Sequence, residues 1–340
     1  MERRKFIKAA VGGIALVGSA DALLVNLPSP KAARAQATAP PDPAWPRRPV
    51  RFIVPLAAGG GLDFVARVVG EPLSRELGQQ VYVENRTGAG GTIGIDAAIK
   101  SPPDGYSVLV TNDNVASAPH VLRLNIDYLN ELLPVVQIGR QPQALAVHPS
   151  LSEVKSVADL IALVKAQPGM GCATSGVGSN QHVLLEWFAK TAGIKLDHVP
   201  YRGAGQAIND VLAGHVKVAF LGPTALLPHA TAGSVRLLAQ SGEARSRSMP
   251  DVPTLVELGY AGVTLESWYA AFLPLGTPAP IVARLNAEIG KVLADAAVRE
   301  NFQKSATEPV GGTAEELARA ARSDSDKYAR LVRELNIRTN

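Results

Sequence analysis

Short runs of β-branched residues alternate with longer stretches of helical periodicity along most of the chain. The first pair is a strand at Val50 to Val54 and a helix from about Asp63 to Leu77, which Pro72 should kink or reset. Further strands are predicted at 81–83, 107–110, 144–147, 170–173, 198–199, 216–220 and 235–239. Further helices are predicted at 91–100, 156–166, 179–191, 206–213 and 281–293, with a last long helix from 313. Strands that are regularly separated by helices predict parallel α/β sheets.

One arrangement of strand, glycine-rich loop and helix occurs twice, at about 50–77 and again at about 170–191. We therefore expect two similar α/β domains that face one another. Two helix starts have the spacing of a capping box, Ser156 with Asp159 and Thr313 with Glu316.

The first glycine-rich loop, Pro55 to Asp63, contains three consecutive glycines between the end of a strand and the start of a helix. Glycines leave the backbone uncovered, and the free N–H groups and partial positive charge of a helix start favour an anion. In open α/β sheets, ligands gather at this edge of the sheet. The alternative is a tight turn with Asp63 as the helix N-cap, and capping is the favoured role for Asp63 itself.

The second glycine-rich loop, Ala173 to His182, adds hydroxyl groups to the glycine backbone. Ser179 is either a simple N-cap or a ligand donor, and the two roles are compatible. His182 lies on the same helix face and is either a ligand contact or a partly exposed histidine without a ligand. Arg202 either supplies a positive charge or is a solvated surface arginine. The loops favour binding of a small anion without catalysis, because a few charged hydrogen bonds of about 1.5–3 kcal/mol each suffice for micromolar affinity.

Sequence motifs of enzymes are absent or incomplete. Phe64 occupies the third glycine position of a dinucleotide-binding pattern, and no phosphate-binding loop of the GxxxxGK type occurs. Ala173 stands where a nucleophile elbow around Ser175 requires glycine. The six histidines have no metal-ligand spacing, and the single cysteine lies in an apolar strand. We therefore expect no catalytic residue, no metal and no cofactor. An exported hydrolase that uses Ser175 or Ser179 with His182 is the remaining enzyme alternative.

The N-terminus has the pattern of an export signal. Basic residues precede a short apolar stretch at 9–20, and small residues near Ala35–Ala37 provide a cleavage site. The pair Arg3 and Arg4 resembles a twin-arginine signal. A membrane helix is the alternative, but an aspartate and several glycines interrupt the stretch, which falls short of the ~20 apolar residues that a span requires. We interpret residues 1–37 as a signal peptide and expect the mature protein in the periplasm.

The formal net charge of +4 belongs to this N-terminal segment. Residues 1–37 contain six of the 34 lysines and arginines but two of the 30 acidic residues, so the mature chain carries 28 of each sign. A nucleic-acid partner would require a basic surplus, and none is therefore expected.

Six motifs follow one another along the mature chain: Pro55 to Asp63, Glu84 to Gly91, Pro103 to Tyr106, Ser175 to Ser179, His198 to Gly203 and Asp251 to Thr254. Together they resemble the Bug family, the periplasmic solute-binding receptors of tripartite tricarboxylate transporters (the TctC type). The resemblance covers nearly all of the mature chain, from Trp45 to the C-terminal helix. It implies a periplasmic binding protein fold of the Venus flytrap type, with two α/β domains, two crossover segments and a hinge between them.

The resemblance also implies domain boundaries and binding residues. Residues 38–143 and 266–340 form domain 1, residues 144–265 form domain 2, and the segment around Trp268, Tyr269 and Phe272 lies at the second crossover. A small carboxylate is held between the domains, partly through ordered waters at the first loop. The ligand-binding residues expected are Leu56, Ala57, Gly59, Gly60, Asp63, Thr111, Asn112, Ser175, Gly178, Ser179, His182, Arg202 and Gly222.

The implied function is that of an extracytoplasmic solute-binding protein, not an enzyme, which captures a small organic carboxylate and delivers it to the membrane subunits of a transporter. The protein is expected to be a monomer. The alternative is a ligand-sensing accessory protein for a two-component sensor kinase, with the same fold and a different partner. Leu221 follows Phe220 where many relatives carry an aspartate, so we predict that the receptor does not prefer amino acids.

Overall fold

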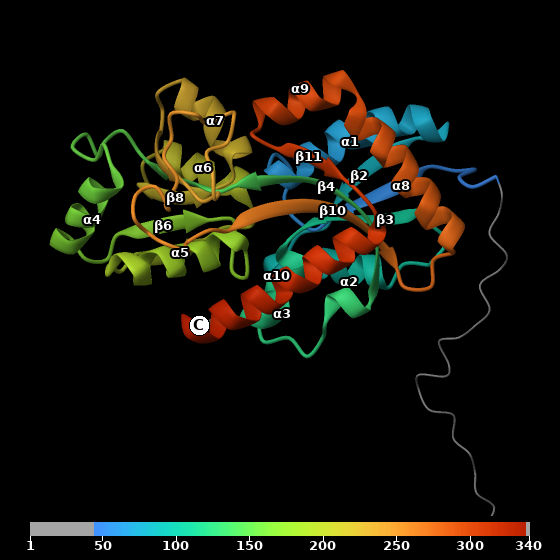
Figure 1. Cartoon of the computed structure of the whole chain (residues 1–340), viewed down its shortest axis with the longest axis horizontal. Helices are drawn as coiled ribbons and strands as arrows, with labels where there is room; N and C mark the ends of the chain where they lie inside the picture. The colour runs from blue at the N-terminus through green and yellow to red at the C-terminus, as the bar shows by residue number, and fades with distance from the viewer. Residues whose placement is uncertain (1–43, 338–340) are drawn as a thin grey trace, which may run out of the picture. The chain divides into compact units, whose positions relative to one another are not determined.

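The computed structural model describes residues 44–337. The expected signal peptide and its cleavage site near Ala35–Ala37 lie outside the described residues. The described part of the chain forms two sheets, each with helices on both faces (Figure 1). The expectation of two α/β domains is confirmed in this respect. We call the first sheet with its helices lobe 1 and the second sheet with its helices lobe 2.

The sheet of lobe 1 has six strands in the order β11-β4-β10-β3-β1-β2. They are β1 (Val50–Val54), β2 (Val81–Asn85), β3 (Ser107–Asn112), β4 (Leu132–Pro142), β10 (Glu266–Pro274) and β11 (Glu308–Gly311). Strand β1 pairs in parallel with β2 and β3. Strand β10 is antiparallel to β3 and β4, and β11 is antiparallel to β4.

The sheet of lobe 2 has five strands in the order β7-β6-β8-β5-β9. They are β5 (Ala144–Val147), β6 (Gly171–Thr174), β7 (Asp197–Pro200), β8 (Val218–Leu221) and β9 (Arg236–Gln240). Strand β6 pairs in parallel with β7 and β8, whereas β5 is antiparallel to β8 and β9.

The expectation of parallel sheets is therefore right for β1–β3 and β6–β8 and wrong for the other strands. Helices separate the strands within each parallel set, so that each next strand can run in the same direction. Strand β5 instead follows β4 of the other lobe directly, and β10 enters lobe 1 from lobe 2, so neither β5 nor β10 follows a helix of its own sheet.

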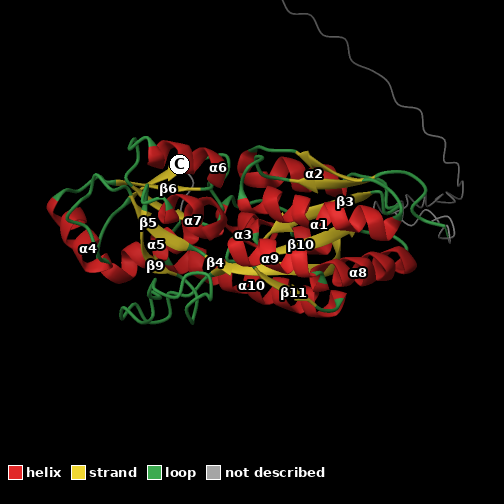
Figure 2. Cartoon of the chain, turned by 90° about the horizontal axis from the view of Figure 1, so that it is seen from above, coloured by secondary structure: helices red, strands yellow, loops and turns green. Residues whose placement is uncertain are grey.

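Helices cover both faces of each sheet. The helices are α1 (Gly61–Leu77), α2 (Thr92–Ile99), α3 (Asn114–Val121), α4 (Val157–Ala166), α5 (Asn180–Ala192), α6 (Ala204–Leu212), α7 (Pro223–Thr231), α8 (Ala279–Ala294), α9 (Ala296–Lys304) and α10 (Ala314–Glu334). In lobe 1, α1, α8 and α9 lie on one face of the sheet, and α2, α3 and α10 lie on the other (Figures 1 and 2). In lobe 2, α4 and α5 lie opposite α6 and α7.

Strand alternation divides the core between these faces. Phe52 of β1 packs with α1 and α8, whereas its neighbour Ile53 packs with α2 and α3. Cys172 and Ala173 of β6 divide in the same way between the two faces of lobe 2. The cluster that contains Ile53 and Cys172 is continuous across both lobes. The lobes therefore share one hydrophobic core on the side of α3, α5 and α10.

Two chain segments connect the lobes, and they are bonded to each other. Gln143 is the single residue between β4 and β5, and the segment 241–265 leads from β9 back to β10. The Gln143 N–H donates to Ser241 Oγ at 2.8 Å, and the Ser241 N–H donates to the Gln143 carbonyl at 2.9 Å. Ser241 Oγ in turn donates to the Leu265 carbonyl at 2.6 Å. The domain boundaries expected at 143/144 and 265/266 stay a prediction for independently folding units.

Local sequence signals identified most helix ends correctly. The capping boxes of Ser156 with Asp159 and of Thr313 with Glu316 are both present. Helix α1 runs through Pro72 without interruption to Leu77, so the helix is not reset at this residue, and the kink stays a prediction. The sequence interpretation did not contain α3, β4, α7, β10, α9 and β11.

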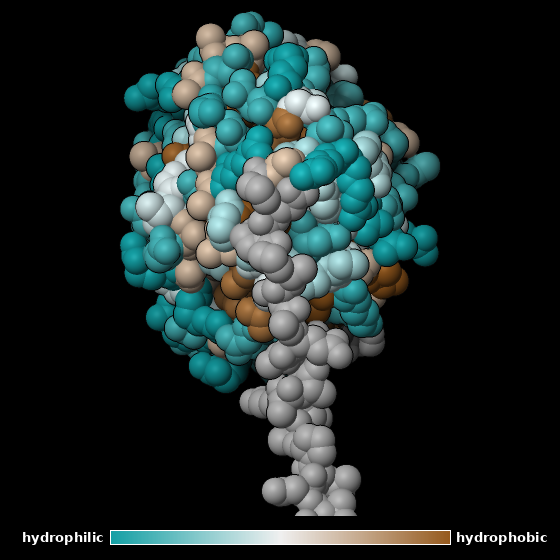
Figure 3. All heavy atoms as spheres, turned by 90° about the vertical axis from the view of Figure 1, so that its right-hand side faces the viewer, coloured by the Kyte–Doolittle hydropathy of each residue, from teal (hydrophilic) through white to brown (hydrophobic). Residues whose placement is uncertain are grey.

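The described surface carries single exposed hydrophobic residues such as Ile93 and Leu275. Figure 3 shows the α8 end of the protein as mainly hydrophilic, with a few hydrophobic residues low on that face. Within residues 44–337, no helix has the length and hydrophobicity that crossing a membrane requires.

Candidate functional site

A small cavity lies where the two glycine-rich loops meet, and its volume is about 30 Å³. Gly60 of the first loop and Ser175 of the second loop both line it, so each lobe contributes one loop. The lining residues are Leu56, Ala57, Gly60, Gly61, Leu62, Asn112, Gln141, Ser175, Gln181, Gly203, Ala204, Gly222, Thr224, Ala225, Ser267 and Tyr269.

Three helices begin at this cavity. Helices α1, α6 and α7 start after Gly60, Gly203 and Gly222, and all three glycines line the cavity. Glycine has no side chain with which to cap the first turn, whereas Ser156 caps α4 and Thr313 caps α10. The first-turn N–H groups at the cavity are therefore open to a ligand, and three helix dipoles add partial positive charge. This arrangement suits an anion.

No charged side chain is among the described residues that line the cavity. Its polar side chains are the amides of Asn112, Gln141 and Gln181 and the hydroxyls of Ser175, Thr224, Ser267 and Tyr269. Burial raises the pKa of the Tyr269 phenol, which is therefore a neutral donor. An anion in this cavity is held by main-chain dipoles and neutral donors instead of an ion pair.

Gln141 connects polar groups of the two lobes at the cavity. Its Nε2 donates to the Tyr269 hydroxyl, and its Oε1 accepts from Thr224 Oγ1 at 3.1 Å. A Cβ on Gly61 would lie 2.6 Å from the Tyr269 oxygen, and a Cβ on Gly222 would lie 2.6 Å from Gln141 Nε2. The helix starts thus approach these side chains as closely as they do because both positions are glycine.

Three predicted residues of the first loop line the cavity, namely Leu56, Ala57 and Gly60, whereas Gly59 and Asp63 do not. Asp63 is not the N-cap of α1 but its third residue. Its carboxylate accepts from the Gly59 N–H at 3.0 Å, from Arg67 Nε at 3.0 Å and from Asn85 Nδ2 at 3.1 Å. Burial opposes ionisation of this carboxyl, but these hydrogen bonds outweigh it and lower the pKa. Asp63 therefore holds the loop in shape from behind.

Ser175 is the one predicted residue of the second loop that lines the cavity. Ser179 is the N-cap of α5, where its Oγ accepts from the His182 N–H at 3.2 Å. His182 is buried and stacks on His198 with ring centroids 3.9 Å apart, and its Nδ1 accepts from the Gly178 N–H at 3.4 Å. Gly178, Ser179 and His182 thus shape the loop and lie outside the cavity lining.

Of the remaining predicted residues, Asn112 and Gly222 line the cavity, and Thr111 and Arg202 do not. Thr111 is buried within β3. Arg202 is exposed, so the expected positive charge does not reach the cavity. Leu221 lies in the hydrophobic core of lobe 2 and also does not line the cavity. None of the described residues that line the cavity is acidic, so the cavity offers no carboxylate partner to the amino group of a ligand. Leu221 is not the reason, because it does not line the cavity.

The lobes touch each other around the cavity at positions without side chains. A Cβ on Gly205 of α6 would lie 3.3 Å from the Ala58 carbonyl of the first loop, and a Cβ on Gly90 would lie 2.7 Å from the Val177 carbonyl. Ser117 Oγ of lobe 1 donates to the Gly178 carbonyl of lobe 2 at 2.5 Å. The structure is therefore a closed arrangement of the two lobes.

The closed cavity is small for an organic ligand. Its volume of about 30 Å³ exceeds the ≳10–15 Å³ that a water molecule needs but is far below the roughly 300–1,000 Å³ of typical ligand pockets. Entry of a carboxylate of several carbons therefore requires the lobes to separate. The shared core on the α10 side and the bonded pair Gln143 and Ser241 hold the lobes together in this structure.

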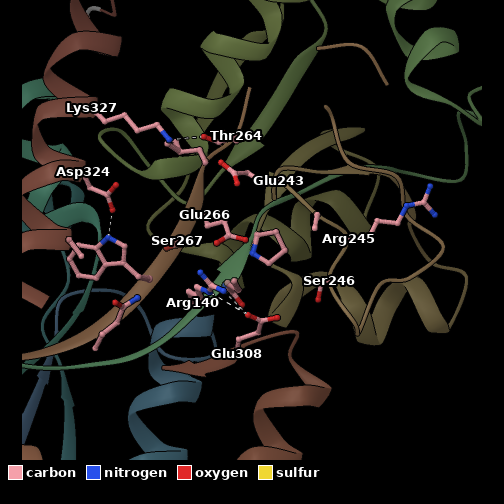
Figure 4. Close-up of a pocket in the computed structure, with 17 residues that line it drawn as sticks. Arg140, Glu243, Arg245, Ser246, Thr264, Glu266, Ser267, Glu308, Asp324 and Lys327 are labelled. Carbon is pink, nitrogen blue, oxygen red and sulfur yellow. Dashed lines mark hydrogen bonds and ion pairs between the residues drawn. The ribbon is translucent and has the colours of Figure 1, made fainter. Parts of the chain in front are cut away.

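A second, larger cleft of about 570 Å³ is lined by β4, β10, α10 and the segment 241–265 (Figure 4). Several of its charged side chains are already engaged within the protein. Arg140 pairs with Glu308 at 3.2 Å, Asp324 accepts from the Trp268 indole at 2.6 Å, and Lys327 donates to the Thr264 carbonyl at 2.9 Å. The Lys327 bond joins α10 to the connecting segment 241–265, whereas the other two bonds lie within lobe 1. The small cavity remains the candidate binding site because three helix starts meet there.

Several lining residues were missed at the sequence level, namely Gly61, Leu62, Gln141, Gln181, Gly203, Ala204, Thr224, Ala225, Ser267 and Tyr269. The starts of α6 and α7 could have been recognised in the sequence, because Gly203 ends the motif His198 to Gly203 and Pro223 is suited to the first position of a helix. Gln181 lies within the second glycine-rich loop but was not chosen there, and Gln141 carries no such signal, since glutamine occurs most often on the surface.

The chain is similar in sequence and fold to known proteins. Residues 65–337 match the family described as tripartite tricarboxylate transporter family receptor. The chain is 37% identical to Protein BugT of Bordetella pertussis over 297 residues, which are 85% of this chain and 90% of BugT.

Two solved structures are similar throughout the described part of the chain. The periplasmic binding protein BugD has a TM-score of 0.81 and 29% identity, with 87% of this chain and 100% of BugD covered. Rpa4515 of R. palustris, solved with adipate, has a TM-score of 0.82 and 30% identity, with 86% of this chain and 98% of that chain covered. The fold is thus that of periplasmic binding proteins, and the chain belongs to the Bug/TctC family of tripartite tricarboxylate transporter receptors.

Proposed function

We propose that this chain is a non-catalytic periplasmic receptor that captures a small organic carboxylate between its lobes and delivers it to the membrane subunits of a transporter. The observation that carries the proposal is the meeting of three glycine-capped helix starts at one uncharged cavity between the lobes. Such a site binds an anion by its main chain and contains no group arranged to attack it. The adipate of the relative Rpa4515 is a carboxylate of the expected kind.

The lining also favours ligands without an amino group. An ammonium group needs an acidic or several carbonyl partners, and no acidic side chain lines the cavity among the described residues. Aspartate and succinate differ by one amino group, so their comparison isolates this effect. We expect succinate to bind more tightly than aspartate.

A thermal-shift screen of the mature protein tests the proposal. The screen includes adipate, succinate, malate and benzoate, with aspartate and glutamate as amine-bearing counterparts and putrescine as a cation. A carboxylate at about a hundred times its Kd stabilises the native state by roughly 2.7 kcal/mol and raises the Tm by several degrees. Calorimetry then gives the Kd. The proposal is wrong if no carboxylate raises the Tm, or if the bound carboxylate is chemically converted during the measurement.

A further inference from the structure

A chain of three buried side chains leads from the cavity wall to the link between the lobes. Ser175 Oγ donates to Gln181 Oε1 at 2.6 Å, and Gln181 Nε2 donates to Gln143 Oε1 at 2.6 Å. Ser175 and Gln181 line the cavity, whereas Gln143 is fully buried behind it. We call these three residues the amide chain.

The amide chain ends on an unpaired donor. Gln143 Nε2 is buried and has no hydrogen-bond partner among residues 44–337. The main chain of Gln143 is held by two hydrogen bonds with Ser241, and its side chain is fully buried. A buried N–H group without a partner is rare, because it loses its hydration and gains nothing in return.

The direction of the amide chain decides what Ser175 offers to the cavity. In the direction described above, the Ser175 proton points to Gln181, and the cavity meets only lone pairs of Ser175 Oγ. An amide carries a donor and an acceptor at nearly equivalent positions, so the same three side chains also form the chain in reverse. In reverse, Gln143 Nε2 donates to Gln181 Oε1, Gln181 Nε2 donates to Ser175 Oγ, and the Ser175 hydroxyl is free to donate to an anion.

We propose that Gln143, which does not touch the cavity, is a positioning residue that allows the amide chain to reverse when a carboxylate binds. The proposal rests on the proposed function of the cavity. The carboxylate gains the Ser175 hydroxyl as a donor only in the reverse direction. Reversal also replaces the unpaired N–H group of Gln143 by an unpaired carbonyl, which proteins tolerate more readily.

Two substitutions of Gln143 separate direction from packing. In its ionised form, Gln143→Glu offers acceptors alone, so it keeps Gln181 Nε2 turned toward residue 143 and keeps the Ser175 proton engaged. Binding is therefore measured at alkaline pH, where a buried carboxyl is more fully ionised. We expect the Kd for adipate or succinate to rise about ten- to a hundredfold, the loss of one hydrogen bond to a charged group. Gln143→Met has a similar volume and no comparable preference, so Gln181 turns freely and the Kd should rise less than about threefold. Equal losses in both variants would overturn the proposal.

A double-mutant cycle separates the amide chain from the mere charge that Gln143→Glu introduces. Gln181→Met interrupts the chain, so adding Gln143→Glu to this variant should leave its Kd nearly unchanged. If the added charge acts directly through space, the Kd rises by the same factor in both backgrounds, and the proposal is wrong. Gln167→Glu is the matched control, because it adds the same charge at an exposed position of lobe 2.

The outcome also separates this proposal from the proposed function. If no carboxylate binds the unsubstituted protein, the function is wrong, and the amide chain is then judged from side-chain amide NMR signals of the ligand-free protein. Gln181 Nε2 there donates to Gln143, so Gln143→Met should move the Gln181 NH2 signals more than Ser175→Ala does. The opposite order contradicts the chain direction seen in the structure.

Discussion

At the scale of single residues, the second glycine-rich loop is held by two stacked histidine rings, of which His182 is buried and His198 is half-buried. His182 and His198 stack within lobe 2, and His198 Nε2 lies 2.7 Å from Thr174 Oγ1. Burial lowers the pKa of His182 to about 4, and burial together with the neighbouring His182 lowers the pKa of His198 to about 3. Both rings are therefore neutral in the folded protein at the pH where free histidine becomes charged.

The first prediction concerns stability against acid. In the unfolded chain both histidines bind protons near pH 6.5, whereas in the folded chain they stay neutral down to about pH 4. Their contribution to stability is complete above pH 6.5 and is lost as the pH falls toward 4. His198→Gln should reduce the slope of unfolding free energy against pH between 6 and 4.5 by about 1.4 kcal/mol per pH unit.

Urea unfolding of both proteins at several pH values measures this slope. Asp113 acts in the opposite sense, because burial raises the pKa of its carboxyl to about 6 and the folded protein retains its proton as the pH rises from 3.8. It is present in both proteins, so the difference between them isolates His198. An unchanged slope would mean that the stacked rings are already protonated in the folded state.

At the scale of elements, the site consists of helix starts, and a backbone substitution tests it directly. Ala204 is the first residue of α6 and lines the cavity. Proline is tolerated at this position of a helix but has no N–H group. Ala204→Pro should weaken carboxylate binding about tenfold, the loss of one charged hydrogen bond, while the Tm without ligand stays nearly constant.

Ala314→Pro is the matched control, because Ala314 is the first residue of α10 and does not line the cavity. Calorimetry and thermal unfolding of both variants provide the comparison. The view of α6 as a ligand-binding helix start fails if Ala204→Pro binds as well as Ala314→Pro.

The helices and strands also show which parts of the fold could be predicted from the sequence. Glycines after strands and residues before helices are local signals, so both loops, the cap Ser179 and both capping boxes were predictable. Strands β4 and β10 were not predicted, because polar and apolar residues do not alternate regularly along them. Strand β4 also contains two prolines, Pro134 and Pro142, which are unusual within a strand. The starts of α6 and α7 lie beside the start of α1 because the two lobes are closed against each other. A local sequence pattern gives no information about this arrangement of the lobes.

At the scale of the whole molecule, the proposed function requires the two lobes to open and close. The cavity is too small for a diacid while the loops touch, so ligand-free molecules must also visit an open arrangement. Ligand then favours the closed arrangement to the extent that it binds it better.

Distances between spin labels test this motion. Glu71 of α1 and Asn209 of α6 are exposed and lie in different lobes, so Glu71→Cys and Asn209→Cys provide the labelling sites. The native Cys172 is buried, and burial raises the pKa of its thiol to about 12, so it should stay unlabelled. We expect the distance distribution to shift to shorter values on addition of adipate or succinate.

Gly205→Leu should abolish this shift and weaken binding more than tenfold, since a side chain there meets the Ala58 carbonyl before the lobes close. Gly290→Leu is the control, because a Cβ at this exposed position of α8 has open space around it. If the ligand still shortens the distance between the labels in Gly205→Leu, the contact between Gly205 and the Ala58 carbonyl does not limit how far the lobes close.

The glycine starts of α1, α6 and α7 have a consequence for how such receptors diversify. Hydrogen bonds from main-chain N–H groups to a ligand are retained when the surrounding side chains change. Gene duplicates can therefore exchange the amides and hydroxyls that face the rest of the cargo, one at a time, and acquire a new preference without passing through a form that has lost its hold on the carboxylate.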